Sequence, residues 1–204
     1  GKTTTKLAVA HVLEQAFPGK VLAHPGNFNS EIGLPLSIFE LPVPGKLTNP
    51  IEWMKILKQI DTKMAGSYPY QHLVLELGID TVGEMGRFMR YLRPDIAVLT
   101  AIAPEHMEQF GDMDTVAREE LQLVRGSDMA ILNAEDATIG SATRPLRLPV
   151  QTYGVKVGQY RFENLTRGRN LTCCGELIIG DDALRVQTNF LGTHNLGSLA
   201  AAAA

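Results

Sequence analysis

Short apolar runs alternate with amphipathic stretches along most of this 204-residue chain. Four runs are apolar almost throughout, at residues 20–23, 72–75, 95–100 and 129–132, and each predicts a buried strand. Amphipathic stretches at residues 7–16, 51–64, 82–92 and 113–125 predict the helices between them. Strands that alternate with helices in this way predict an α/β fold with a doubly wound, mostly parallel sheet.

The pattern changes after about residue 149. Alternating segments at residues 160–162, 171–173, 176–179 and 184–187 are separated by Gly and Asp-Asp turns. This spacing predicts antiparallel hairpins, which would form a small β subdomain over residues 150–190. The chain then ends in five alanines, which predict a helix, and Thr193 or Asn195 is a candidate cap for its start. Residues 25–50, rich in Pro, Gly and Asn, predict a long functional loop.

Charge and cysteine content narrow the class of protein. The net charge is −3 with both signs dispersed, which gives no basis for nucleic acid or a membrane surface as a partner. The two cysteines, Cys173 and Cys174, are adjacent and poorly placed to bridge each other, which favours a reducing, cytoplasmic setting. No apolar run approaches the ~18 residues of a membrane span.

The first residues, Gly1-Lys2-Thr3-Thr4, match the end of the phosphate-binding loop pattern G-x-x-x-x-G-K-[ST]. In such a loop backbone N–H groups surround the nucleotide phosphates, the lysine reaches the β- and γ-phosphates, and the next hydroxyl binds Mg²⁺. The helix predicted directly afterwards is the context that the motif requires. Threonines that merely cap this helix are the alternative. Because the chain begins inside the motif, we expect a fragment of a longer protein, truncated at both ends.

Two further residues follow predicted strands, where ligands bind in doubly wound sheets. Glu76 ends the strand at 72–75, and His106 lies just beyond the strand at 95–100. Adjacent strands could bring both side chains to Mg²⁺ held at Thr3. Taken singly, Glu76 is better explained as a solvated strand-end acid, and His106 as a surface or helix-capping histidine. When both residues are considered together with a phosphate loop at the same sheet edge, a metal site is favoured.

Six blocks, in order, carry a resemblance to a known family. They are GKTTTK at residues 1–6, GNFNSEIGLP at 26–35, LELG at 75–78, PEHMEQFG at 104–111, NAED at 133–136 and GTHN at 192–195. Through them the chain resembles the central, ATP-binding domain of the Mur ligases, which build the peptide stem of the bacterial cell wall. Blocks 26–35 and 75–78 are most similar to members that add D-alanyl-D-alanine.

The resemblance implies roles for the residues at the matching positions. The catalytic group would comprise Lys2, Glu76, His106 and Glu120. ATP would bind at Gly1, Lys2, Thr3, Thr4, Asn133, His194 and Asn195, the last two beside adenine. Mg²⁺ would be held by Thr3, Glu76 and His106, and Asn29 and Ser30 would contact the substrate. The implied partners are a UDP-muramoyl-peptide and D-alanyl-D-alanine, and we expect a cytoplasmic monomer.

One position departs from the family pattern. Related ligases usually carry a carbamylated lysine in the helix after the histidine block, and counting from His106 puts Glu120 there. We hypothesise that the Glu120 carboxylate replaces the carbamate, through a bridging water if the shorter stem requires one. The alternative is that Glu119 and Glu120 are solvated helix acids.

Related enzymes remain as alternatives. Folylpolyglutamate synthases usually follow the loop lysine with Gly-Ser rather than Thr3-Thr4, and isoglutaminyl-synthase relatives need four zinc-binding cysteines. A tripeptide-forming ligase, or a nucleotide-binding module that has lost ligation, stays open. Mur ligases also have an N-terminal UDP-binding domain and a C-terminal domain for the amino substrate. Since residues 1–204 correspond to neither, we expect this fragment alone to be inactive.

Overall fold

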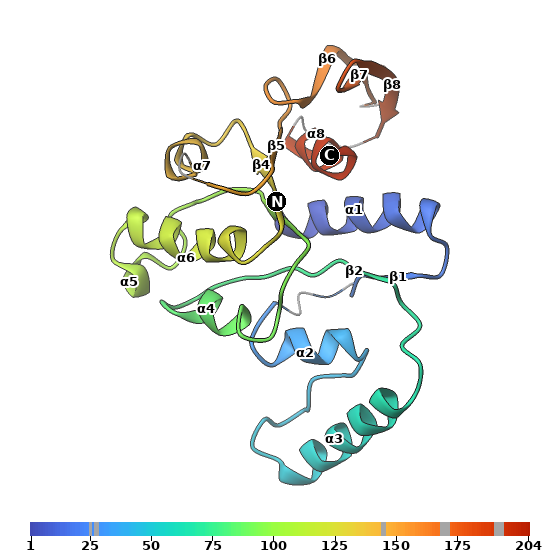
Figure 1. The fold of residues 1–204 in the computed structure, drawn as a ribbon, viewed down its shortest axis with the longest axis vertical. Helices are drawn as coiled ribbons and strands as arrows, with labels where there is room; N and C mark the ends of the chain where they lie inside the picture. Colours follow the sequence, from blue (N-terminus) through green and yellow to red (C-terminus); the bar gives the residue numbers. More distant parts are fainter. Residues whose placement is uncertain (25, 27–28, 144–145, 168–171, 190–193) are drawn as a thin grey trace. The chain divides into compact units, whose positions relative to one another are not determined.

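The computed structural model describes residues 1–204 apart from 25, 27–28, 144–145, 168–171 and 190–193. The described chain forms two compact units, one of Gly1–Val9 with Ile79–Ala204 and one of Ala10–Gly78. The first helix, α1 (Lys2–Ala16), runs from one unit into the other. Figure 1 shows the elements of both units.

A six-stranded sheet forms the centre of the first unit. Its order is β3 (Ile96–Leu99), β4 (Met129–Asn133), β5 (Val150–Tyr153), β6 (Tyr160–Arg167), β7 (Cys173–Ile179) and β8 (Asp182–Thr188). The strands β3 to β6 pair in parallel, whereas β6–β7 and β7–β8 are antiparallel. The predicted α/β class, with a mostly parallel sheet and antiparallel strands near the C-terminal end, is confirmed.

The antiparallel strands continue the parallel sheet through a short connection. β5 and β6 share one residue pair, Tyr153 with Tyr160, and the chain between them turns tightly at Gly158. Gly158 has a φ of +116°, and a Cβ there would lie 2.8 Å from the Tyr153 carbonyl carbon. A side chain at this position would therefore be strained and would clash with the backbone of β5.

Helices cover the sheet of this unit on two sides. On one side lie α4 (Glu84–Phe88), α5 (Met107–Phe110), α6 (Met113–Arg125) and α7 (Ala137–Ala142), and on the other side of β4 and β5 lies α8 (His194–Ala203) (Figure 1). Leu196, Ala200 and Ala201 of α8 are buried with Phe162 and Leu177 of the antiparallel strands. The alanine-rich end of the chain is thus a packed core helix, because small side chains allow it to approach the sheet closely.

The second unit contains α2 (Gly33–Ile38), α3 (Pro50–Ala65), and the short parallel pair β1 (Val21–Leu22) and β2 (His72–Leu73). Asn49 caps α3 by accepting hydrogen bonds from the N–H groups of Ile51 and Glu52, and Pro50 occupies the first turn. A small core forms where Ile56 of α3 packs with Leu36 of α2 and Leu41.

Several elements differ from the sequence predictions. The predicted loop at 25–50 contains α2, and the predicted helix at 82–92 is regular only over α4. The segments predicted at 171–173 and 176–179 are joined in one strand, β7, although Leu171 lies outside the described residues. The suggested cap at Thr193 also lies outside them.

Candidate active site

The start of α1 presents Lys2, Thr3 and Thr4 in the first helical turn. This turn contains no acidic residue, so the unpaired N–H groups and the positive end of the helix dipole favour an anion. The Thr5 hydroxyl donates to the Gly1 carbonyl at 3.2 Å and lies 3.0 Å from the Ser198 hydroxyl of α8. Thr5 therefore ties this turn to α8 and does not cap the helix with its side chain.

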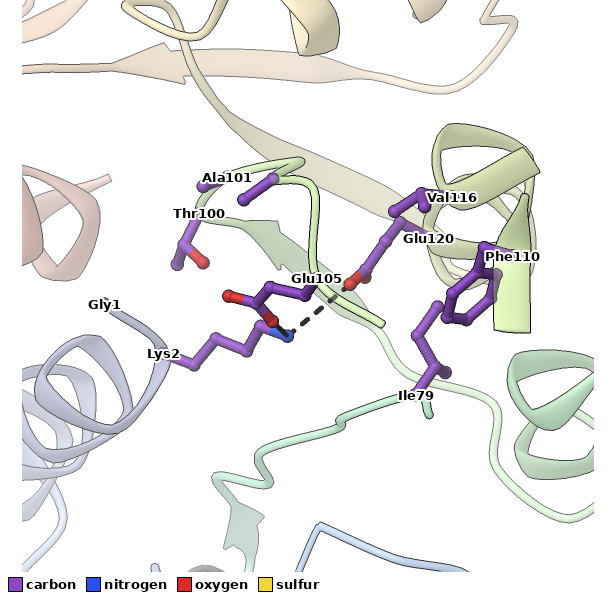
Figure 2. A pocket seen from close by; sticks show the side chains of 10 residues that line it. Gly1, Lys2, Ile79, Thr100, Ala101, Glu105, Phe110, Val116 and Glu120 are labelled. Carbon is purple, nitrogen blue, oxygen red and sulfur yellow. Dashed lines mark ion pairs between the residues drawn. The ribbon is translucent and has the colours of Figure 1, made fainter. Parts of the chain in front are cut away.

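A pocket opens beside Lys2 (Figure 2). Its lining comes from the start of α1, the segment between β2 and α4, the segment after β3, and helices α5 and α6. It comprises Gly1, Lys2, Ile79, Thr100, Ala101, Ala103, Glu105, Phe110, Val116 and Glu120. The segment lies beyond the carboxyl end of a parallel strand, where ligands bind in folds of this class.

Two carboxylates converge on the Lys2 ammonium in this pocket. The Lys2 Nζ atom lies 3.6 Å from Glu120 Oε1 and 3.9 Å from Glu105 Oε2 (Figure 2). The Glu120 side chain is 10% exposed and that of Glu105 is 65% exposed, so the pair with Glu120 is much less screened by water.

Burial raises the pKa of the Glu120 carboxyl, while the nearby Lys2 ammonium opposes this rise. Glu119 is also buried, and within the described residues its Oε2 atom has no hydrogen-bond partner. The alternative that Glu119 and Glu120 are solvated helix acids is therefore wrong. Of the two, Glu120 lines the pocket and contacts Lys2.

His106 precedes α5 in a left-handed backbone conformation, with a φ of 52°. Such a conformation is uncommon for residues other than glycine. The imidazole makes no capping bond, and its Nε2 atom lies 3.2 Å from Asp80 Oδ1. Both side chains are exposed, so this pair is largely screened by water.

Asn133, at the end of β4, is engaged on both sides of its amide. Its Nδ2 atom donates to the Thr100 carbonyl at 2.8 Å, and its Oδ1 atom accepts from Glu135 N–H at 3.0 Å. An amide nitrogen can donate two hydrogen bonds, and the bond to Thr100 is one of them. His194 and Asn195 begin α8, and the structure describes the backbone of His194 but not its side chain.

Three predicted residues belong to the second unit. Glu76 follows β2 and is half-buried. The Asn29 carbonyl accepts from Gly78 N–H at 3.3 Å, which ties the predicted substrate loop to the LELG block. The Ser30 hydroxyl accepts from Gly33 N–H at 3.1 Å, and the Ser30 carbonyl accepts from Leu34 N–H at 2.9 Å at the start of α2.

Within the described residues, no three His, Cys, Asp or Glu side chains form a cluster suited to a metal ion. Mg²⁺ at nucleotide sites is usually held by one or two carboxylates together with phosphate oxygens. Glu105 and Glu120, which both lie beside the Lys2 ammonium, are a donor set of that kind. The oxygen ligands of the pocket thus fit a hard divalent cation accompanied by phosphate.

Two residues around this site were not predicted from the sequence. Glu105 directly precedes His106 in the PEHMEQFG block, so its position was a usable signal. Asp80 is far from His106 along the chain, and no spacing rule connects the two.

Comparison with known proteins identifies the family. The family model described as the Mur ligase middle domain matches residues 1–204. The chain belongs to the Mur ligase middle domain family. This membership confirms the resemblance found in the sequence.

The Mur ligase domain is 28% identical, over 166 residues, to the UDP-N-acetylmuramoyl-tripeptide–D-alanyl-D-alanine ligase of Borreliella burgdorferi, covering 81% of this chain and 30% of that protein. MurF from Acinetobacter baumannii has a similar fold, with a TM-score of 0.76 at 21% identity over 99% of this chain and 39% of that one. MurF ligase from Thermotoga maritima, solved in complex with ADP, gives a TM-score of 0.73 at 21% identity over 99% and 42%.

The Mur ligase domain thus spans 30–42% of the length of these three proteins. Among its described helices, none is both long enough and apolar enough to cross a membrane.

Proposed function

We propose that this chain is the nucleotide-binding domain of an ATP-dependent ligase that joins a UDP-muramoyl-tripeptide to D-alanyl-D-alanine in peptidoglycan precursor synthesis. The observation that carries the proposal is the Lys2 ammonium, which faces a buried carboxylate in a pocket at the start of α1. Membership of the Mur ligase family and the similarity to UDP-N-acetylmuramoyl-tripeptide–D-alanyl-D-alanine ligases support the choice of reaction and substrates.

The reaction proceeds through an acyl phosphate. A carboxylate oxygen of the tripeptide attacks the γ-phosphorus of ATP, the bond to the β,γ-bridging oxygen breaks, and ADP leaves. The amine of D-alanyl-D-alanine then attacks the acyl carbon, phosphate leaves with the former carboxylate oxygen, and the amine loses a proton to solvent. Catalysis requires positioning and neutralisation of charge rather than a protein nucleophile.

Each candidate residue has a role in this proposal. Lys2 binds the β- and γ-phosphates, with Gly1, Thr3 and Thr4 beside them at the helix N-terminus. Asn133 contributes to ATP binding, and His194 and Asn195 lie beside adenine, where the imidazole stacks and the amide hydrogen-bonds the base edge. Asn29 and Ser30 contact the muramoyl peptide, whose UDP end and amino partner are bound by other domains of the full-length protein.

The oxygen donors at this pocket fit Mg²⁺, for which we propose Thr3, Glu76 and His106 as further contacts. When bound, Mg²⁺ would neutralise charge on the phosphoryl oxygens. Glu120 takes the place of the family's carbamylated lysine: it is buried and already beside Lys2. Glu105, Glu120 and a polyphosphate in one pocket would repel one another. The positive charge of the Lys2 ammonium is therefore needed there even before Mg²⁺ binds.

The test uses the full-length gene product, ATP and Mg²⁺, with the tripeptide and D-alanyl-D-alanine present together, singly or absent. We expect phosphate release only with both partners. Lys2→Ala should abolish it, whereas Lys55→Ala, at an exposed lysine of α3, should leave it unchanged. Phosphate release that ignores either partner would contradict the proposed substrates.

Glu120 is tested separately by Glu120→Gln. Loss of a residue that supports a metal site typically costs about 10–100-fold in metal affinity or activity, and we expect a loss of that order in kcat. Glu108→Gln, an exposed glutamate of α5, is the matched control and should retain full turnover. If Glu120→Gln kept its Mg²⁺-dependent turnover, Glu120 would not replace the carbamate.

A second function is favoured by the same departure at Glu120. A domain that lost the modified lysine could keep the fold and bind nucleotide without ligation. ATP binding without phosphate release under any substrate combination would support this alternative.

We further propose that the protein is a monomer. We also propose that it is cytoplasmic, because its proposed substrates are ATP and a soluble UDP-linked precursor.

A further inference from the structure

The segment at 100–103 forms one wall of the pocket beside Lys2. Thr100, Ala101 and Ala103 line the pocket, while Ile102 between them is only 5% exposed. The segment follows β3, has no regular secondary structure, and leads directly to Glu105. Its buried backbone groups therefore need partners from another part of the chain.

Asn133, the last residue of β4, and Asp136, the N-cap of α7, supply these partners. Asn133 Nδ2 donates to the Thr100 carbonyl at 2.8 Å, and Asp136 Oδ2 accepts from the Ile102 N–H at 2.9 Å. β3 and β4 are parallel neighbours, so their carboxyl ends meet at one edge of the sheet. Contacts between residues more than 30 positions apart thus fix the backbone of the pocket wall.

Asp136 uses its two oxygens for different purposes. Oδ1 accepts from Ile139 N–H at 3.0 Å and caps α7, while Oδ2 holds Ile102. A single acceptor is enough for a helix cap, so a cap alone does not require a carboxylate. Asp112, which caps α6 by accepting from Thr115 N–H at 2.7 Å, makes no comparable bond to a distant segment among the described residues.

We infer that Asp136 is a positioning residue, which holds the pocket wall at Ile102 and thereby the placement of Glu105 and His106. The inference rests on the proposed function, because its effect is measured as the rate of ligation. We call the hydrogen bond from Ile102 N–H to Asp136 Oδ2 the clamp. The clamp does not involve the start of α1, so its loss should leave ATP affinity unchanged and slow the phosphoryl transfer. Misplacement of reacting groups by about 1 Å can cost on the order of 10²-fold in rate.

The experiment is Asp136→Asn in the full-length gene product. Asparagine keeps one oxygen to cap α7, but its amide nitrogen cannot accept from Ile102 N–H. We expect kcat to fall on the order of 10²-fold, the KM for ATP to change little, and the Ile102 amide to exchange faster with deuterium. Asp112→Asn makes the same replacement at a cap without the second bond and should change none of these.

Asp136→Ser is the second variant, because serine is a good cap but too short to hold both N–H groups. If the wild-type protein turns over and both Asp136 variants match Asp112→Asn in kcat, the positioning role is overturned. It is also overturned if the KM for ATP rises as much as kcat falls. If the wild-type protein shows no ligation, the proposed function fails instead of the positioning role. If the Ile102 amide of the Asp136 variants exchanges as slowly as in the wild type, the hydrogen bond from Ile102 to Asp136 does not hold the pocket wall.

Discussion

Glu120 is a carboxylate kept in a buried position by the packing of α6, with Lys2 as its counter-charge. Burial raises the pKa of Glu120 although Lys2 opposes the rise. The folded protein thus binds this proton more tightly than the unfolded chain does. Its contribution to stability is present at low pH and is lost as the pH rises through the raised pKa.

This linkage predicts the effect of Glu120→Gln on stability. At neutral pH the variant has no buried charge and should have a higher free energy of unfolding than the wild type. Below the ordinary glutamate pKa of about 4.3 the advantage should disappear, because Glu120 is then protonated in both states. Hydrogen exchange of the α6 amides in urea, at neutral pH and below about pH 4.3, measures the difference in unfolding free energy between the variant and the wild type.

Glu108→Gln is the control, since that side chain is exposed and should show no such dependence. A Glu120→Gln variant that is less stable than the wild type at neutral pH would mean that the ion pair with Lys2 outweighs burial.

The residues of the pocket differ in how far the sequence could predict them. Lys2 was predicted because its motif is local, and Glu120 because its distance from His106 along the chain has a family counterpart. The pair between His106 and Asp80, and the clamp from Asp136 to Ile102, depend on segments that only the fold brings together. Periodicity and spacing contain no information on such contacts.

At the level of elements, α1 and α8 meet through two buried hydroxyls, Thr5 and Ser198, 3.0 Å apart. This contact links α1, which begins at Lys2, to α8, which begins with His194 and Asn195. A hydrogen bond inside a protein typically contributes about 1 kcal/mol, and more when its loss leaves a buried group unpaired.

Ser198→Ala should therefore lower the free energy of unfolding by about 1–2 kcal/mol. Ser141→Ala removes an exposed hydroxyl bond within α7 and should stay within about 0.5 kcal/mol of the wild type. Urea unfolding, followed by exchange of α8 amides, compares the two. Equal effects of both substitutions would refute the link between α1 and α8.

The contact between α4 and α6 gives a second prediction at this level. Phe88 of α4 is 1% exposed, whereas Tyr91, whose ring lies 6.3 Å away, is 50% exposed. Phe88→Ala should cost about 3–5 kcal/mol of unfolding free energy by the loss of buried apolar surface and the cavity left behind. Tyr91→Ala should cost clearly less in the same urea experiment, and a similar cost would contradict this account of the core.

The strands were easier to predict than the short helices. β3 and β4 follow from apolar runs, because strands covered on both faces are apolar at successive positions. Six-residue α2 lies in a stretch with Gly33 and Pro35, whose composition is that of a loop. α4 begins after Gly83, which has a φ of +90°, so the helical pattern predicted from residue 82 could not be regular from its start.

At the scale of the whole molecule, the described chain is two compact units that share α1. The first contains the pocket, the parallel sheet and the helix with the predicted adenine contacts. The second contains the predicted substrate loop and Glu76. Fold class and family followed from the sequence because the strands, helices and motif blocks occur along the chain in the order that the family has.

The central claim is that the pocket at Lys2 transfers the γ-phosphoryl group of ATP to a carboxylate. We would test it in the full-length gene product with UDP-muramoyl-tripeptide whose reacting carboxylate is labelled with ¹⁸O in both oxygens. An acyl phosphate requires one labelled oxygen in each phosphate released, and one in the new amide. Phosphate that is free of label, or label that appears in AMP, would contradict the account.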